Sequence, residues 1–336
     1  MIAKSPLLFG VCLGAAFCFP MAAFAQQIEL QTGFVVPWDP VSKQSLAEHY
    51  DRLQKIADVS VSVIAGGKIV ETRSSLPPSA IVSKRVEAPR LTLVVQNASG
   101  GQWFGEATAA WLSDSNLRAQ VAARLVALAQ ARKANGVMID FEAVPAGAQA
   151  DLLRLLADLH GLLSASDLRL AVTVPVADPA WDLTKISARV DEVVAMAYDQ
   201  HWPGGDPGPI AATDWFREVV ARLAIEVPLA KLTVAVASYA YDWPSGAPAM
   251  PVPVPTALAV ARSHDSAVVT DAGGGAHYSY REGSSVHQVW LATAGDVYRQ
   301  ISFARALGIR KFALWRLGTE DAAIWTGRIT STSRSP

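Results

Sequence analysis

Two acidic residues, Asp140 and Glu142, follow the apolar run 136–139 and are the residues of this sequence best suited to chemistry. The run predicts a buried β-strand, and residues i and i+2 of a strand point to the same face. Burial and mutual repulsion raise the pKa of one member of such a pair, which then keeps its proton near neutral pH. A protonated acid beside a carboxylate is the arrangement that glycoside hydrolysis requires.

Taken alone, the pair also fits an ordinary strand end, whose acids cap the next helix or pair with an arginine. The elements around it therefore matter. Eight short apolar runs alternate with amphipathic stretches, which predicts a parallel α/β fold closed into a TIM (β/α)8 barrel. The expected strands cover residues 33–37, 59–64, 91–95, 136–141, 168–175, 192–197, 232–237 and 311–315.

Amphipathic periodicity predicts the helices of this barrel. The clearest helical patterns cover residues 45–56, 117–134, 149–163, 215–224 and 297–307. Ser45 and Glu48 have the spacing of a capping box for the first of them. The segment from about 239 to 292 breaks the alternation with Pro-rich and Gly-rich turns and short strands, and it predicts a small, mostly β insertion between strands seven and eight.

Residues 1–25 have the pattern of a secretory signal peptide: a short basic start, an apolar stretch and the small-residue site Ala23-Phe24-Ala25. Cleavage after Ala25 would leave one domain, residues 26–336, without Cys12 and Cys18, the two cysteines of the chain. The mature protein would then have no disulfide and no thiol nucleophile. We expect a periplasmic or secreted monomer with no membrane span after cleavage.

Charge and histidine spacing exclude other classes of protein. The 29 basic and 30 acidic residues give a net charge of −1 without a basic stripe, which argues against a nucleic-acid partner. The six histidines show no metal-ligand spacing, so we expect neither a metal nor a cofactor.

Aromatic and acidic residues follow several other expected strands. Catalytic groups of such barrels lie at the carboxyl ends of the strands. Any one of these residues alone would more often belong to the core or to a loop, but together with the acid pair they predict a carbohydrate-binding cleft. They are Trp38, Met196, Tyr198, Asp199, Tyr239, Tyr241 and Trp315, with Trp202 in the Gly/Pro-rich loop after strand six.

These motifs resemble the family 18 glycoside hydrolases, which include chitinases and related N-acetylglucosaminidases. Residues 135–142 are similar to the family's strand-four signature DGxDxDxE, residues 196–199 to its strand-six MxYD, and Trp315 to its strand-eight tryptophan. Residues 202–209 and 315–320 resemble a bacterial branch with spore-germination-type peptidoglycan hydrolases and barrel modules fused to polysaccharide deacetylases.

The sequence departs from the signature at two positions. Asn135 and Met138 stand where the signature has aspartates, so no deeper carboxylate can support Asp140. Activity is not excluded, because that branch often lacks the middle aspartate. The resemblance leaves Asp140 to be oriented by another group, for which Tyr198 and Thr173 are the candidates.

The resemblance implies a substrate-assisted mechanism. Glu142 would protonate the leaving oxygen while the 2-acetamido carbonyl of the substrate attacks the anomeric carbon. Asp140 would stabilise the oxazolinium nitrogen, and Tyr198 would hold the acetamido oxygen. Asp199 would contact the sugar or its acetamido group, and Trp315 would form the apolar floor.

The remaining strand-end residues are assigned to substrate binding. Rim packing stays open for Trp38, and packing within the insertion stays open for Tyr239 or Tyr241. Met196 and Trp202 complete the set.

The predicted function is an exported glycosidase that retains configuration and cleaves β-1,4-linked glycans containing N-acetylglucosamine. Two alternatives remain: a chitinase-like glycan-binding protein with weak or no turnover, and an accessory protein of exopolysaccharide assembly. The presence of Glu142 favours the enzyme, because lectin-like members of the family usually replace this acid.

Overall fold

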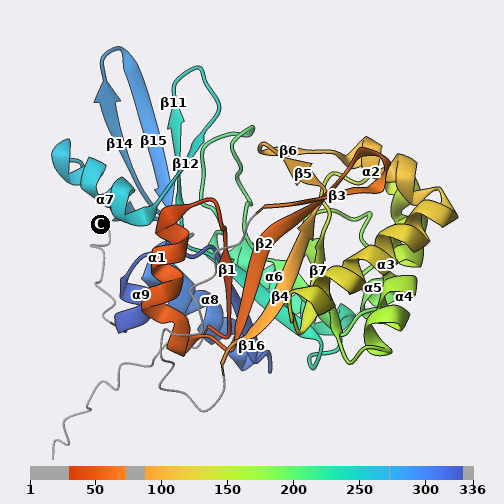
Figure 1. Ribbon diagram of the computed structural model, residues 1–336. Coiled ribbons are helices and arrows are strands. Elements are labelled where there is room, and N and C mark those ends of the chain that lie inside the picture. The colour runs from red at the N-terminus through yellow and green to blue at the C-terminus, as the bar shows by residue number, and fades with distance from the viewer. Residues whose placement is uncertain (1–29, 73–87, 272, 328–336) are drawn as a thin grey trace, which may run out of the picture.

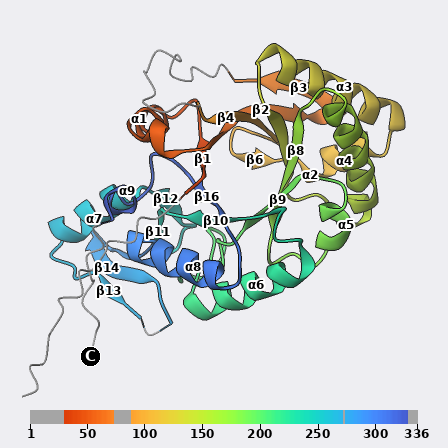
Figure 2. The ribbon, with the colours of Figure 1, turned by 90° about the horizontal axis from the view of Figure 1, so that it is seen from below.

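The computed structural model of this chain describes residues 30–72, 88–271 and 273–327. Eight parallel strands form a closed ring, because β1 pairs with β16 on one side and with β2 on the other. The predicted TIM (β/α)8 barrel is thus confirmed, and Figure 2 shows the ring of strands with helices outside it. The predicted signal peptide lies outside the described residues.

The barrel strands lie close to the predicted ranges. They are β1 (Thr32–Val35), β2 (Lys55–Ile64), β4 (Arg90–Gln96), β7 (Gly136–Asp140), β8 (Arg169–Pro175), β9 (Glu192–Met196), β10 (Leu232–Ala237) and β16 (Lys311–Trp315). Outside the ring, β3 (Lys68–Glu71) pairs antiparallel with β2. After β4 the chain forms a short hairpin, β5 (Ala98–Ser99) and β6 (Gln102–Trp103).

Helices follow most of the strands. They are α1 (Pro40–His49), α2 (Gly105–Leu112), α3 (Ser115–Ala131), α4 (Gln149–Ser164), α5 (Leu183–Ser187), α6 (Thr213–Glu226), α8 (Ala294–Ala306) and α9 (Ala323–Thr326). Short 3-10 turns are η1 (Tyr50–Arg52), η2 (Ala65–Gly67) and η3 (Ala146–Ala148).

Alternation along each strand sorts its side chains between two cores. Outward-facing residues pack with the helices in the larger core. Inward-facing residues fill the barrel, where small side chains leave room for the bulkier Phe34 and Met138, so the interior is packed rather than open. The inward set is Phe34, Val36, Ala57, Val59, Val94, Met138, Ala171, Val194, Ala235 and Ala313.

The first helix covers Pro40–His49 instead of the predicted 45–56. Its N-cap is Asp39, whose carboxylate accepts a backbone N–H of the first turn. Proline suits the first helical position, because the N–H that it lacks would have no helical partner there. The predicted capping box of Ser45 and Glu48 is therefore wrong, since Ser45 lies inside the helix.

Between β10 and α8 the chain forms a separate antiparallel sheet with the strand order β12-β11-β15-β14-β13. Its elements are β11 (Ala240–Pro244), β12 (Met250–Val252), α7 (Val254–Ser263), β13 (Val269–Thr270), β14 (Ala276–Glu282) and β15 (Ser285–Leu291). Figure 1 shows this insertion and the β5–β6 hairpin standing above the same end of the barrel. This is the end at which the strands carry the predicted site residues.

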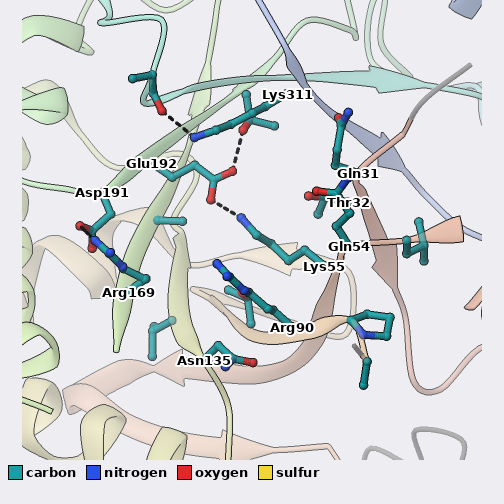
Figure 3. A pocket seen from close by; sticks show the side chains of 18 residues that line it. Gln31, Thr32, Gln54, Lys55, Arg90, Asn135, Arg169, Asp191, Glu192 and Lys311 are labelled. Carbon is teal, nitrogen blue, oxygen red and sulfur yellow. Dashed lines mark hydrogen bonds and ion pairs between the residues drawn. The ribbon is translucent and has the colours of Figure 1, made fainter. Parts of the chain in front are cut away.

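The opposite, amino-terminal end of the barrel holds a cavity of about 580 Å3. In it, the Glu192 carboxylate pairs with Lys55 of β2 and accepts a hydrogen bond from Thr233 of β10 (Figure 3). Burial alone would raise the pKa of Glu192, but Lys55 and Thr233 outweigh it and hold this pKa below its usual value. This partly buried pair and its hydrogen bond to Thr233 therefore join three strands of the ring.

Replacing Lys55 with Met should lower the free energy of unfolding by roughly 2–4 kcal/mol at pH 7, because it leaves the Glu192 carboxylate without its cation. The pair stabilises the fold above the ordinary carboxyl pKa, and this contribution is lost as the pH falls through the lowered pKa of Glu192. The difference between wild type and variant should therefore shrink at pH 4 in urea unfolding. Lys185→Met, which breaks an exposed pair with Asp182, is the control and should change the free energy of unfolding much less than Lys55→Met. Equal losses in the two variants would contradict the structural role of Lys55.

Candidate active site

Asp140 and Glu142 lie at the carboxyl end of β7. Asp140 is the last residue of the strand and is 3% exposed, while Glu142 is partly buried. Phe141 between them is fully buried and packs edge-to-face on Trp111 of α2, with 6.0 Å between ring centroids. The strand end is therefore anchored in the helix layer through Phe141, while the carboxyl groups on either side of it interact with each other.

Glu142 has the properties of an acid that keeps its proton. Burial raises the pKa of its carboxyl group, and the charges of Asp140 and Asp199 raise it further, to about 8. No other described residue forms a hydrogen bond or ion pair with this carboxyl group. It is thus protonated at neutral pH and open to a ligand.

Two neutral donors hold the Asp140 carboxylate. Gln96 donates from Nε2 to Oδ2 at 2.8 Å, and the Thr173 hydroxyl donates to Oδ1. Gln96 lies beside Asp140 in the register of β4 and β7, and Thr173 belongs to β8 on the other side. Burial raises the pKa of Asp140, and these two hydrogen bonds oppose that shift. Of the two partners predicted for Asp140, Thr173 is observed, and Tyr198 makes no hydrogen bond to it.

Asn97 holds the main chain of Glu142. Its Oδ1 accepts the Glu142 N–H at 2.9 Å, and its Nδ2 donates to the Glu142 carbonyl at 2.8 Å. The same Nδ2 donates to Thr108 of α2 at 3.1 Å, and the Asn97 side chain is fully buried. A side-chain amide therefore continues the hydrogen-bond pattern past the last residue of β7 and fixes the backbone of the acid.

Gln96 and Asn97 are site residues that the sequence reasoning missed. Both are polar and directly follow the apolar run 91–95, which is the third expected strand. Because the carboxyl ends of parallel strands meet at one end of a barrel, this position was the signal that could have identified them.

A third carboxylate, Asp199, faces this acid pair from the segment after β9. It accepts hydrogen bonds at Oδ1 from the hydroxyls of Tyr239 and Tyr241, the second at 3.0 Å. Its backbone has a φ of 57°, a left-handed conformation that aspartate adopts more readily than most residues. The Asp199 residue as a whole is exposed, but the surrounding protein desolvates its carboxylate and so raises its pKa. The hydrogen bonds from the two phenols partly offset this shift.

The phenols of Tyr239 and Tyr241 act as donors here. Desolvation and the charge of Asp199 raise the pKa of both hydroxyl groups above the usual value. Their rings pack edge-to-face, with 5.1 Å between centroids. Both residues therefore belong to the site and to the small aromatic core at the root of the insertion.

Tyr198 places a neutral hydroxyl near all three acids. Burial raises the pKa of this phenol well above its usual value, and the charges of Asp199, Asp140 and Glu142 add to the shift. Among the described residues none forms a hydrogen bond with its hydroxyl. The group can thus donate a hydrogen bond to a ligand.

Trp315 lies where the barrel interior meets the aromatic core. It is the last residue of β16, is partly buried and packs edge-to-face on Phe34, with 5.3 Å between ring centroids. It contacts both hydrophobic clusters that border the site. Met196, the last residue of β9, is partly buried too. The indole of Trp315 therefore retains accessible surface at the mouth of the barrel.

Trp38 and Trp202 lie on the surface, with exposed fractions of 59% and 57%. Trp202 folds back over its own loop: a Cβ at Gly204 would lie 2.2 Å from the indole, so a side chain at this position would displace the indole. The loop is tied to the insertion by a hydrogen bond of 3.1 Å from Trp243 Nε1 to the Gly205 carbonyl. The structure thus gathers the acids and tyrosines into one cluster and leaves these two tryptophans as exposed aromatic surfaces.

Within the described ranges, no three histidine, cysteine, aspartate or glutamate side chains gather as metal ligands would. None of the described helices has the length and apolar character needed to cross a bilayer.

Replacing Glu142 with Gln should stabilise the protein, and more so at pH 8 than at pH 5. Between its usual pKa and about 8 the folded state holds a proton that the unfolded state has lost, so wild-type stability falls as the pH rises through this range. Glutamine removes this dependence. Thermal unfolding should show a gain of about 2–4 °C for each kcal/mol recovered. Glu106→Gln on the exposed face of α2 is the matched control, and a gain equal at both pH values would contradict the raised pKa.

Comparison with known proteins identifies the family. The family described as glycosyl hydrolases family 18 matches residues 86–320. A chitinase structure from Chromobacterium violaceum superposes with a TM-score of 0.78 at 25% identity, covering 89% of this chain and 97% of that one. The spore cortex-lytic enzyme SleL of Bacillus cereus shares the fold, with a TM-score of 0.78 at 21% identity, covering 90% of this chain and 74% of that one.

A cortical fragment-lytic enzyme of Bacillus cereus is 24% identical over 248 residues, which are 69% of this chain and 58% of that protein. The chain spans only 56–62% of the length of three curated relatives that it matches. Since the family match covers well over half of the chain, the chain belongs to the glycosyl hydrolases of family 18.

Proposed function

We propose that this protein hydrolyses β-1,4-linked glycans containing N-acetylglucosamine, with retention of configuration. The observation that carries this proposal is Glu142, a carboxyl group with a pKa of about 8 that has no side-chain partner among the described residues. An acid that stays protonated through neutral pH can protonate a poor leaving group such as a sugar oxygen.

The attacking group in this proposal is the acetamido oxygen of the substrate. Glu142 donates its proton to the glycosidic oxygen as that bond to the anomeric carbon breaks, and the acetamido oxygen forms a new bond to the same carbon. Glu142, now ionised, takes a proton from a water molecule whose oxygen bonds to the anomeric carbon. The bond from that carbon to the acetamido oxygen breaks, which opens the oxazolinium ring and restores the acetamido group. The two inversions together leave the β configuration.

The other site residues have roles that match their chemistry. Asp140 stabilises the positive charge that develops on the acetamido nitrogen. Tyr198 donates its unpartnered hydroxyl to the acetamido oxygen. Asp199 is held by two phenols and accepts a hydrogen bond from the sugar. Trp315 and Met196 provide apolar contact beneath the ring, and Trp202 and Trp38 contact more distant sugars.

The stereochemistry of the first product tests this mechanism. Proton NMR of fresh digests of chitin oligosaccharides, peptidoglycan glycan strands and poly-N-acetylglucosamine should show the β-anomer first, on whichever polymer is cleaved. The same oligosaccharide with a free amine at the cleaved sugar should resist cleavage, since it has no attacking carbonyl. Early appearance of the α-anomer, or equal cleavage of the amine substrate, would refute substrate assistance.

Replacing Glu142 with Gln should reduce kcat by about two to four powers of ten, because the amide cannot donate the proton. Oligosaccharide binding should survive in the variant. Activity of the wild type should decline above about pH 8, as Glu142 loses its proton. Glu106→Gln should retain full activity. If wild type and Glu142→Gln bind alike and neither cleaves, the protein is a glycan-binding protein.

Replacing Trp202 with Ala should raise KM for long oligosaccharides by roughly three- to tenfold and leave kcat nearly unchanged. Loss of one aromatic contact corresponds to about 0.5–1.5 kcal/mol, and Trp202 lies outside the acid cluster. Ile225→Ala on α6 removes another exposed apolar side chain and is the control. An unchanged KM for long oligosaccharides would remove Trp202 from substrate binding.

We also propose that the protein is exported, with residues 1–25 as its signal peptide. Cell fractionation with amino-terminal sequencing of the mature protein tests this, and a mature chain that begins at Gln26 is expected.

A further inference from the structure

The three acids at the barrel mouth are not neutralised by cations. Among the described residues, no lysine or arginine affects the pKa of Asp140, Glu142 or Asp199. Salt bridges are plentiful elsewhere, for example Arg316 to Asp39 at 2.6 Å on the rim. The charges that develop in this site must therefore be supported by neutral hydrogen-bond donors.

Asp140 has the most demanding environment of the three acids. It is nearly fully buried, and Met138, two residues earlier on the same inward face of β7, is fully buried among alanine and valine side chains. The titratable groups near Asp140 are Glu142 from its own strand end and Tyr198 from the segment after β9, and Asp199, next to Tyr198, acts on Glu142. All of these are acidic or neutral.

The two strands beside β7 supply the hydrogen-bond donors to Asp140 that the apolar interior of the barrel lacks. From β8, Thr173 donates to Oδ1, but a hydroxyl can equally accept a hydrogen bond from a protonated carboxyl group. Gln96 of β4 differs, because the Nε2 that lies 2.8 Å from Oδ2 can only donate. A donor binds the charged oxygen of a carboxylate more strongly than the carbonyl oxygen of a carboxylic acid, so this bond favours the ionised form of Asp140.

We propose that Gln96 is a positioning residue that holds Asp140 as a carboxylate in one fixed orientation. The preceding inward residue of β7, Met138, has no hydrogen-bond donor that could do this. Register explains why the position suits this task, since Gln96 is the direct partner of Asp140 across β4 and β7. The inference rests on the proposed function only for its kinetic consequence.

That consequence concerns Glu142. The charge on Asp140 is one cause of the raised pKa of Glu142. A residue that keeps Asp140 ionised therefore also keeps Glu142 protonated. Without Gln96, Asp140 should take up a proton at higher pH, and Glu142, relieved of a neighbouring charge, should lose its proton at lower pH. The pH range in which Asp140 is charged while Glu142 is protonated should therefore become narrower at both its acid end and its alkaline end.

The experiment compares Gln96→Met, which keeps the length of the side chain and removes the donor, with Gln96→Glu, which replaces the amide with a second acid. In Gln96→Met the acid limb of the kcat/KM profile should move up by about one to two pH units, since a hydrogen bond to a charged group has roughly that effect on a pKa. The alkaline limb should move down. In Gln96→Glu the acid limb should move further, because two adjacent carboxyl groups share one proton. KM should change less than kcat.

Carboxyl 13C NMR titration gives a readout that needs no turnover. Resonances assigned with Asp140→Asn should show Asp140 titrating at higher pH in Gln96→Met than in wild type, with the apparent values belonging to the coupled pair. Gln130→Met removes a surface glutamine of α3 that bonds Ser166 and should change neither the titration nor the profile. Circular dichroism confirms that each variant is folded.

Two outcomes separate this inference from the proposed function. If the wild type cleaves none of the three glycans, the proposed function fails, and the NMR titration still decides the role of Gln96. If Gln96→Met is folded and both its Asp140 titration and its pH profile match the wild type, the inference is overturned.

Discussion

Electrostatic repulsion among three carboxyl groups in the mouth of an apolar barrel is the constraint on which this site depends. Desolvation alone would drive Asp140, Glu142 and Asp199 towards their neutral forms. Among the residues that the structure describes, the groups that oppose this are an amide, an alcohol and two phenols, and none is a lysine or arginine. Neutral donors can hold two acids as acceptors without attracting the proton away from Glu142, which a nearby cation would do.

The parallel barrel is what makes this arrangement possible. Each acid comes from one strand end, and each donor comes from another: Gln96 from β4, Thr173 from β8, and Tyr239 and Tyr241 from the segment around β11. Because all eight strands run the same way, their last residues meet at one end. At the amino-terminal end of the barrel the acid Glu192 is stabilised differently, because a cation, Lys55, neutralises it directly. One end of the same barrel thus stabilises the fold, and the other maintains an acid with an unusual pKa.

Periodicity and strand-end position located most of this from the sequence. The eight strands could be predicted because buried parallel strands are short apolar runs. Asp140 and Glu142 stood out because two acids at i and i+2 point to one face at the end of such a run. The capping box at Ser45 was wrong because a local motif was preferred to Asp39-Pro40, and the observed N-cap, Asp39, lies six residues before Ser45. Gln96 and Asn97 were missed because their contacts depend on the register between neighbouring strands. The spacing of residues along one strand does not show which residues of the next strand lie beside them.

Closure of the ring through β1 and β16 links the chemistry of the site to the order in which the chain folds. Thr32 lies beside Ala313, so the last barrel strand must find the first across nearly the whole sequence. Contacts so distant in sequence form slowly, because a long loop must close before they contribute. Until they form, the ring stays open and Trp315 is absent from its mouth. Because burial is the first cause of the raised pKa of Glu142, we expect this pKa to reach about 8 only once the barrel has closed around the acid.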